Sequence, residues 1–165
     1  MKIADPTSAL QWATSRCARQ ECCRQDIEKK LRDTPLSEEE REEVIERLEN
    51  DGFIDHKRYA RAFVHDKLEY DRWGRLKMAQ ALRLKGIDRR DIDEAFEEVI
   101  DEDHYREILK RVLESKQRTL RFDASDTRAA YAAAQKLVRF AASRGFESHL
   151  IFDAVDDLEV PDDDF

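Results

Sequence analysis

The sequence contains few residues that interrupt helices. Its 165 residues include only four glycines and three prolines. Both residue types tend to end helices, because glycine is too free in its backbone and proline has no amide hydrogen. No apolar run reaches the roughly 18 residues of a membrane span, and residues 1–10 lack the apolar stretch of a signal peptide. We therefore expect a helical, soluble, cytoplasmic protein with no membrane partner.

Residues that would support catalysis or metal binding are also scarce. The three cysteines all lie in CARQECC at 17–23, and an odd number without an export signal argues against a disulfide framework. No glycine-rich phosphate loop, nucleophile elbow or His-Glu metal motif is present. The four histidines, His56, His65, His104 and His149, also lack the spacing of zinc ligands. We therefore expect no enzyme activity, no cofactor and no metal.

The clearest local signal is a corner between two helices at 82–88. A helical apolar pattern stops at Gly86, which is typical of the left-handed residue that follows a helix. Asp88 then has the position of an N-cap, and Ile87 and Ile92 have the spacing of a hydrophobic staple. Similar signals predict helix starts at Ser37, Asp55 and either Ser125 or Asp126.

The corner recurs along the chain. When the sequence is shifted by 51 residues, five apolar positions from Leu31 to Leu48 align with five from Leu82 to Val99. A further shift of 59 residues aligns the second set with 141–158 and places Gly145 on Gly86. Pro35 replaces the glycine in the first copy, so that corner must turn differently. The matches favour internal repeats, although three similar helix pairs without common ancestry would also give such a pattern.

The pattern predicts an all-α fold: an elongated, curved stack of three tandem three-helix repeats. Leu76, Ala79, Tyr131 and Ala134 are among the residues expected on inner helix faces, and 115–123 is expected to be a basic connector. The predicted organisation is a lead at 1–8, repeats at 9–52, 53–101 and 102–158, and an acidic disordered tail at 159–165.

Charge is segregated along the chain, which the net charge of -8 conceals. Residues 55–90 contain 11 Lys and Arg against five Asp and Glu, whereas residues 91–103 contain eight acids and no base. Residues 147–165 likewise contain eight acids and no base. Stacked repeats with this pattern would carry separate acidic and basic edges, although any single charge is more simply a solvated one.

An ordered set of motifs resembles the RecX regulators of bacterial RecA recombinase. The set includes LENDGFID at 48–55, RYA at 58–60, FV at 63–64, WGR at 73–75 and LRLKGI at 82–87. CARQECC and the plan of three three-helix repeats fit the same family, so the resemblance covers about 9–158. The resemblance implies a protein that binds the RecA filament on single-stranded DNA and inhibits its ATPase and strand-exchange activities. The sequence leaves the oligomeric state open, and a monomer is our default expectation. The resemblance also implies a role in recombination, DNA repair and the SOS response. The long acidic tail after Leu158 and the acidic balance depart from the family pattern, and because of the acidic balance we expect only weak or indirect contact with single-stranded DNA.

We expect the filament to contact a basic surface on the second and third repeats. Arg58, Arg61 and Arg75 lie in or beside the family motifs, and the other members are chosen on charge, except Trp73. Trp73 suits either packing against a neighbouring repeat or exposure at a binding surface, whereas Tyr59 and Phe63 suit the core. The predicted contact residues are Lys57, Arg58, Arg61, Lys67, Arg72, Trp73, Arg75, Lys77, Lys110 and Arg111.

Two other functions fit the same residues. The corners resemble a helix-turn-helix, with Lys85, Arg89 and Arg90 beside one of them, so the chain could be a helical-repeat DNA-binding protein. The acidic helices after the corners argue against this function, because phosphate would repel them. The second alternative is a helical scaffold for an unrelated protein, which would be indifferent to a RecA filament.

Overall fold

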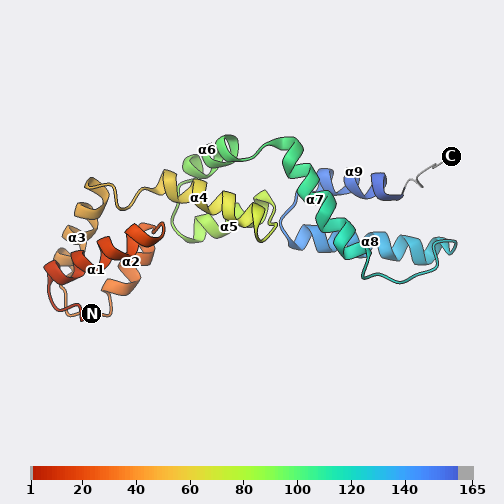
Figure 1. Ribbon diagram of the computed structural model, residues 1–165. Coiled ribbons are helices and arrows are strands. Elements are labelled where there is room, and N and C mark those ends of the chain that lie inside the picture. The colour runs from red at the N-terminus through yellow and green to blue at the C-terminus, as the bar shows by residue number, and fades with distance from the viewer. Residues whose placement is uncertain (1, 160–165) are drawn as a thin grey trace. The chain divides into compact units, whose positions relative to one another are not determined.

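A computed structural model describes residues 2–159 of the chain, with side chains up to Leu158. Those residues form nine helices and no strand, so the all-α prediction is confirmed (Figure 1). Within the same stretch, no helix has the length and apolarity that a membrane span requires. The helices are α1 (Pro6–Arg19), α2 (Arg24–Leu31), α3 (Glu38–Asn50), α4 (His56–Glu69), α5 (Arg75–Leu84), α6 (Arg89–Val99), α7 (Glu102–Gln117), α8 (Thr127–Ser143) and α9 (Ser148–Glu159).

The predicted helix starts are set by side-chain caps. Ser37 and Glu40 form the reciprocal capping box expected at α3. Asp55 accepts from the Arg58 amide at the start of α4, at 3.1 Å. Of the two candidates before α8, Asp126 is the cap, because its carboxylate accepts from the amides of residues 128 and 129.

Glycines form the corners in the expected left-handed conformation. Gly86 and Gly145 have φ values of 79° and 95°. At both corners the amide after the glycine bonds back to a carbonyl five residues earlier: Ile87 to Leu82 at 3.1 Å and Phe146 to Ala141 at 3.3 Å. The first corner turns differently, as Pro35 predicted, and there the Leu31 carbonyl accepts from the Thr34 amide at 3.2 Å.

The nine helices fall into three consecutive groups of three, as expected of tandem repeats, but the compact units are two. Unit 1 contains Met1–Phe63 and Ala81–Glu98, and unit 2 contains Val64–Gln80 and Val99–Phe165. The division therefore runs through α4 and α5 rather than between repeats. The exact repeat boundaries at 52/53 and 101/102 remain a prediction.

Each unit has its own apolar core. In unit 1, α3 packs against α1 and α2, and the core includes the fully buried Ile27, Leu31 and Leu48. In unit 2, α7, α8 and α9 pack together (Figure 1), and the fully buried residues include Tyr105 and Phe146. Burying side chains of this size stabilises each unit by about 1.5–3 kcal/mol per residue.

Some details differ from the sequence-based expectation. Leu76 and Tyr131 were expected on inner faces but are exposed, and Met78 occupies the buried position on α5 instead. Helix α7 continues to Gln117, so the connector is shorter than 115–123. The predicted acidic tail lies outside the described residues, apart from Glu159 at the end of α9.

Candidate partner-binding surface

In unit 1 the predicted contact residues lie on the first two turns of α4. Lys57 pairs with Glu94 at 3.5 Å, and Arg61 pairs with Glu98 at 3.4 Å. Both cations are about half exposed, and ion pairs of this kind contribute only about 0–1 kcal/mol. These two side chains can therefore leave their partners for a competing anion at little cost.

Arg58, the third predicted residue on α4, is held more firmly. Its Nε donates to Glu21 at 2.5 Å, and its Nη2 donates to the carbonyls of Gly52 and Phe53 at 3.0 and 3.4 Å. The hydrogen bond to Glu21 raises the pKa of the Arg58 guanidinium. Arg58 thus ties the α3–α4 turn to the segment between α1 and α2, which is a structural role.

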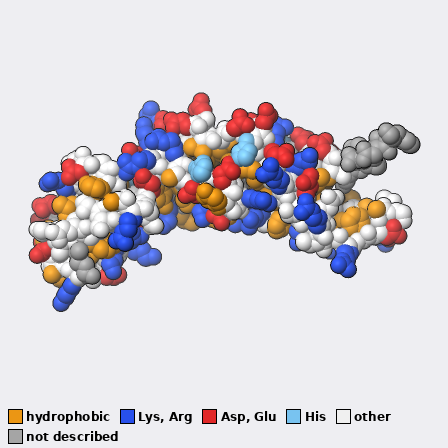
Figure 2. Space-filling view, viewed as in Figure 1, with side chains coloured by type: hydrophobic (Ala, Val, Ile, Leu, Met, Phe, Trp, Pro, Cys, Tyr) orange, Lys and Arg blue, Asp and Glu red, His pale blue; other side chains and the backbone are white. Residues whose placement is uncertain are grey.

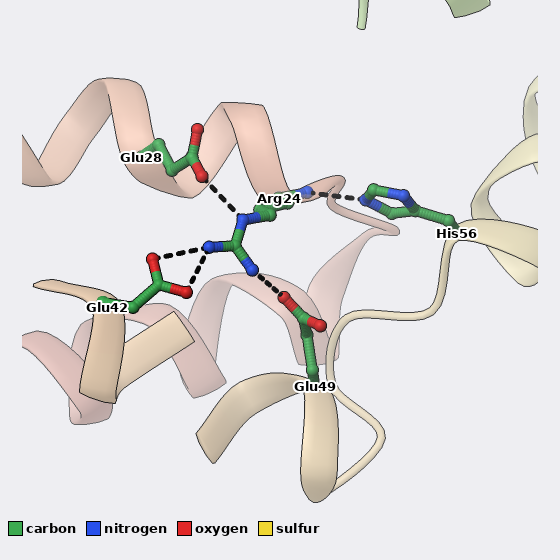
Figure 3. Close-up of polar contacts among 5 residues, drawn as sticks. All are labelled: Arg24, Glu28, Glu42, Glu49 and His56. Carbon is green, nitrogen blue, oxygen red and sulfur yellow. Dashed lines mark hydrogen bonds and ion pairs between the residues drawn. The ribbon is translucent and has the colours of Figure 1, made fainter. Parts of the chain in front are cut away.

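Arg24, which the sequence did not single out, is the most highly paired cation in unit 1. Its guanidinium donates to Glu28 at 2.7 Å, to Glu49 at 2.6 Å and to both oxygens of Glu42 (Figure 3). The hydrogen bonds to Glu42, first, and then to Glu28 and Glu49 raise the pKa of Arg24. Its main-chain amide also donates to His56 Nε2 at 3.1 Å, so it joins α2, α3 and the start of α4.

Arg75 has the equivalent role in unit 2. Its guanidinium pairs with Glu147 at 2.7 Å and with Glu102, and it lies 4.0 Å above the Tyr105 ring. The Arg75 amide donates to the Tyr105 hydroxyl at 3.0 Å, and that hydroxyl donates to Glu147. Burial alone would lower the pKa of Arg75, but the bonds to Glu102 and Glu147 outweigh it and raise the pKa. With its side chain only 22% exposed, Arg75 fastens α5 to α7 and α9.

Beside Arg75, two main-chain segments are in direct contact. The Gly74 amide donates to the Arg144 carbonyl at 2.8 Å, and the Leu76 amide donates to the Gly145 carbonyl at 3.0 Å. A Cβ added at Gly74 would lie 2.3 Å from the Gly145 carbonyl carbon. Only glycine allows the start of α5 to reach the α8–α9 corner this closely.

A basic and aromatic cluster lies immediately before this contact. The Trp73 ring has Lys67 Nζ 4.6 Å and Lys77 Nζ 4.5 Å from its centre, and Lys67 also pairs with Asp71 at 3.1 Å. Trp73 is half-buried, and its neighbour Arg72 is exposed with a left-handed φ of 54°. Of the predicted contact residues, the structure brings Lys67, Trp73 and Lys77 together.

The last two predicted residues lie apart on α7. Lys110 and Arg111 are exposed, and each is within 4.0 Å of a glutamate one turn away, Glu114 and Glu107. Such pairs along one helix are weak, at about 0.3–0.5 kcal/mol. Figure 2 shows basic and acidic side chains mixed with one another on the face in view.

The sequence of this chain is similar to sequences of one known protein family. A sequence model described as RecX, second three-helix domain, matches residues 55–95. Regulatory protein RecX of Prosthecochloris aestuarii is 30% identical over 159 residues, which are 96% of this chain and 98% of that protein. The chain belongs to the RecX family. RecX of Clostridium botulinum strain Alaska E43 is 33% identical over 78% of this chain but only 59% of its own length.

Solved RecX structures have the same fold. A crystal structure of regulatory protein RecX has a TM-score of 0.78 and 27% identity, and the alignment covers 92% of this chain and 73% of that one. RecX from Lactobacillus salivarius has a TM-score of 0.79 at 21% identity, over 94% and 97% of the two chains. The resemblance of the motif set to RecX regulators is therefore confirmed.

The RecX match at 55–95 contains eight of the ten predicted contact residues, all except Lys110 and Arg111. Sequence reasoning left out a second basic group. Residues 115–145 contain seven Lys and Arg and two acids. Five of these cations are exposed and make no ion pair with any residue between 2 and 158. The five are Arg118, Arg121, Arg128, Lys136 and Arg139. The local charge balance, seven bases against two acids, is the sequence signal that points to them.

Proposed function

We propose that this RecX-family chain is a cytoplasmic negative regulator of RecA recombinase. It binds, as a monomer, to the RecA filament on single-stranded DNA and inhibits ATP hydrolysis and strand exchange. The observation that carries the proposal is the match to a RecX regulatory protein along almost the full length of both chains. By inhibiting RecA, the chain regulates recombination, DNA repair and the SOS response.

The contact surface proposed for the filament consists of cations whose own partners are weak. On α4 these are Lys57 and Arg61, whose surface ion pairs exchange easily. In unit 2 the cluster of Lys67, Trp73 and Lys77, with the exposed Arg72, offers positive charge beside an aromatic ring. Lys110 and Arg111, whose ion pairs are also weak, are two further proposed contact residues on α7. Attraction of this kind accelerates association and weakens as salt increases.

Arg58 and Arg75 contribute to the proposed function indirectly. Both guanidinium groups already donate to carboxylates of the same unit, and Arg58 also donates to main-chain carbonyls. A filament would have to displace these partners before it could bind either side chain. Their part in the proposal is to fix the segments that carry Lys57 and Lys77.

A helix-turn-helix function has less support. Helix α6, which follows the Gly86 corner, has only two basic residues, Arg89 and Arg90. These pair with Asp93 at 3.8 Å and Glu94 at 3.3 Å on the same helix. The remaining acids would repel the phosphates of a DNA groove. The proposal includes weak or indirect contact with single-stranded DNA. It does not include recognition of a DNA base sequence by α6.

The test is the single-stranded-DNA-dependent ATPase activity of RecA from the same organism, with this chain added below one molecule per protomer. We expect inhibition at low salt that weakens as salt increases. The Arg72→Glu, Lys77→Glu double variant should inhibit at least tenfold less, because it reverses two charges beside Trp73. A Lys29→Glu, Lys30→Glu variant is the control, because these two lysines are exposed on α2, a helix that carries none of the proposed contact residues.

The ATPase results distinguish an error in the proposed function from an error in the proposed contact surface. If the folded wild-type chain leaves ATP hydrolysis unchanged, the proposed function is wrong and a helical scaffold with another partner is the better account. If the wild-type chain inhibits and both double variants inhibit equally well, the function stands but the contact surface lies elsewhere. Equal binding to bare single-stranded DNA would favour the DNA-binding alternative.

A further inference from the structure

Helix α8 in unit 2 carries positive charge and no negative charge. Its 17 residues, TRAAYAAAQKLVRFAAS, include Arg128, Lys136 and Arg139 but no aspartate or glutamate. All three cations are exposed, and none pairs with an acid among residues 2–158. On α6 and α7, by contrast, exposed cations pair with acids one turn away. The charge of α8 is therefore available to a ligand.

The three cations lie on the side of α8 that faces away from the core. Arg128 and Arg139 are eleven residues apart, which is three turns of an α-helix and about 16 Å along its axis. Lys136 lies one turn before Arg139, so their side chains are neighbours. The buried residues of the helix occupy the opposite side, where α8 packs against α7 and α9: Ala133, Leu137 and Ala141. The α8 face, defined by Arg128, Lys136 and Arg139, is thus a row of unpaired positive charges.

The nearest acids in sequence, one before α8 and one after it, have other partners. Asp126 is the N-cap, and its carboxylate accepts from the amides of residues 128 and 129 at 3.0 and 3.2 Å. Glu147 pairs with Arg75 at 2.7 Å and accepts from the Tyr105 hydroxyl. Neither carboxylate is paired with a cation of the α8 face. The electrostatic potential at this face therefore favours an anion.

An exposed aromatic ring lies beside these cations. Tyr131 is 67% exposed and lies one turn after Arg128, so the two side chains are neighbours on the helix. The ring also borders an open groove of about 490 Å³, which leaves space for a planar group next to it. Proteins bind single-stranded nucleic acid with this combination, because bases stack on aromatic rings while phosphates pair with cations.

A single strand fits this face better than a duplex or an acidic protein does. A helix reaches the bases of a duplex by entering the major groove, but α7 and α9 pack against α8. In a single strand the bases are exposed and can stack on Tyr131 directly. An acidic protein would satisfy the cations, but its carboxylates would leave the Tyr131 ring uncovered.

We propose that the α8 face binds single-stranded DNA, with phosphates at Arg128, Lys136 and Arg139 and one base stacked on Tyr131. This inference rests on the proposed function, because it gives a place to the weak contact with single-stranded DNA included there. The bare strand binds more weakly than the RecA filament, since only three cations and one ring hold it. None of these four residues is among the predicted filament contacts, so the two surfaces can be tested separately.

The test is fluorescence anisotropy of a labelled oligothymidylate, titrated with the full chain in the absence of RecA. Three phosphate contacts predict a slope of about −2 for log K against log salt, so affinity should fall about twentyfold between about 50 and 200 mM salt. Arg128→Gln with Arg139→Gln should flatten the slope to about −0.7. The control is Arg89→Gln with Arg90→Gln, which removes the same charge from α6, where both arginines pair on their own helix. The control should keep the wild-type slope.

The aromatic contact is tested separately. Tyr131→Ala should weaken binding about five- to a hundredfold, because it removes the ring on which a base stacks, whereas Tyr131→Phe should keep wild-type affinity. An oligomer of the same length without bases should bind to the wild-type chain and to Tyr131→Ala equally well. Phe152→Ala is the matched control and should bind like wild type, because Phe152 is 53% exposed on α9 and is not part of the α8 face.

Three results would overturn the proposal. The first is a folded wild-type chain that does not bind the oligomer at about 50 mM salt. The second is wild-type binding by the α8 variants together with lost binding in Arg72→Glu, Lys77→Glu, because the strand would then lie at Trp73. The third is polyglutamate that competes equally well per charge, because an acidic protein would then be the better partner. RecA is absent from this assay, so each of these failures can be told apart from a failure to inhibit RecA.

Discussion

Replacing Gly74 by alanine should break the main-chain contact between the start of α5 and the α8–α9 corner. The new Cβ would lie 2.3 Å from the Gly145 carbonyl carbon and 2.4 Å from the Phe146 nitrogen, both main-chain atoms. Neither atom can rotate away as a side chain would. The two segments must therefore separate by about 1 Å before the contact becomes an ordinary van der Waals one.

The cost can be worked out from what this separation breaks. Overpacking against a rigid neighbour costs about 1–3 kcal/mol. Separation also stretches the hydrogen bonds from Gly74 to Arg144 and from Leu76 to Gly145, each worth about 1 kcal/mol net. The alanine gains back about 0.4–1 kcal/mol, because it restricts the unfolded chain. We expect a net loss of about 2–4 kcal/mol in the free energy of unfolding.

Urea denaturation followed by circular dichroism at 222 nm measures this loss. Gly86→Ala is the control. Gly86 is a corner glycine with a φ of 79°, and nothing lies within 4 Å of a Cβ added there. Its cost comes only from the left-handed conformation and should be about 1–2 kcal/mol. If Gly74→Ala costs no more than Gly86→Ala, the close approach does not limit the junction, and the reasoning is refuted.

Three further predictions concern polar contacts. Tyr105→Phe removes the hydroxyl that joins Glu147 to the Arg75 amide and should cost about 1–3 kcal/mol in urea denaturation, whereas an effect near zero would exclude that role. Arg24→Lys keeps the charge but not the planar fork, so it should cost about 1 kcal/mol in a thermal melt; an unchanged melting temperature would contradict this. Burial alone would raise the pKa of Asp26, but the hydrogen bond from Lys85 at 2.8 Å and that from Cys23 lower it. The stabilisation is therefore present above the ordinary pKa of about 3.9 and lost as pH falls further, so Asp26→Asn should lose less stability than wild type between about pH 5 and pH 3.

The helices were predictable from sequence because their signals are local. Ser37, Asp55 and Asp126 cap helices within three residues of themselves, and Gly86 and Gly145 end helices by their own backbone freedom. Such features need no knowledge of distant parts of the chain. The all-α class and the order of the elements followed from them.

Inner faces were less predictable where a helix is short. On α5, Leu76 and Met78 lie two positions apart and both suit a core, but only Met78 is buried. The choice depends on which side of the helix its neighbours cover, and the apolar pattern does not specify that. Tyr131 was misassigned for the same reason, because one side of α8 borders an open groove.

The contact surface was the least predictable part. The family motif selected Arg75 and charge selected Lys77, yet Arg75 is paired with Glu147, 72 residues away in sequence. Only the fold brings such partners together, so a charge count cannot separate internal ion pairs from exposed cations. Arg24 was not singled out for the same reason: two of its three carboxylates come from α3.

The division of the chain into two compact units has a consequence for its synthesis. Unit 1 includes residues 81–98 as well as 1–63, so the unit is not complete until the ribosome has made residue 98. Residues 64–80 emerge before that point, yet their own partners begin only at residue 99. These residues, which include the buried Leu68 and Met78, can complete their unit only after the rest of unit 2 is translated, at about 5–20 residues per second. No single cut in the chain can release either unit whole.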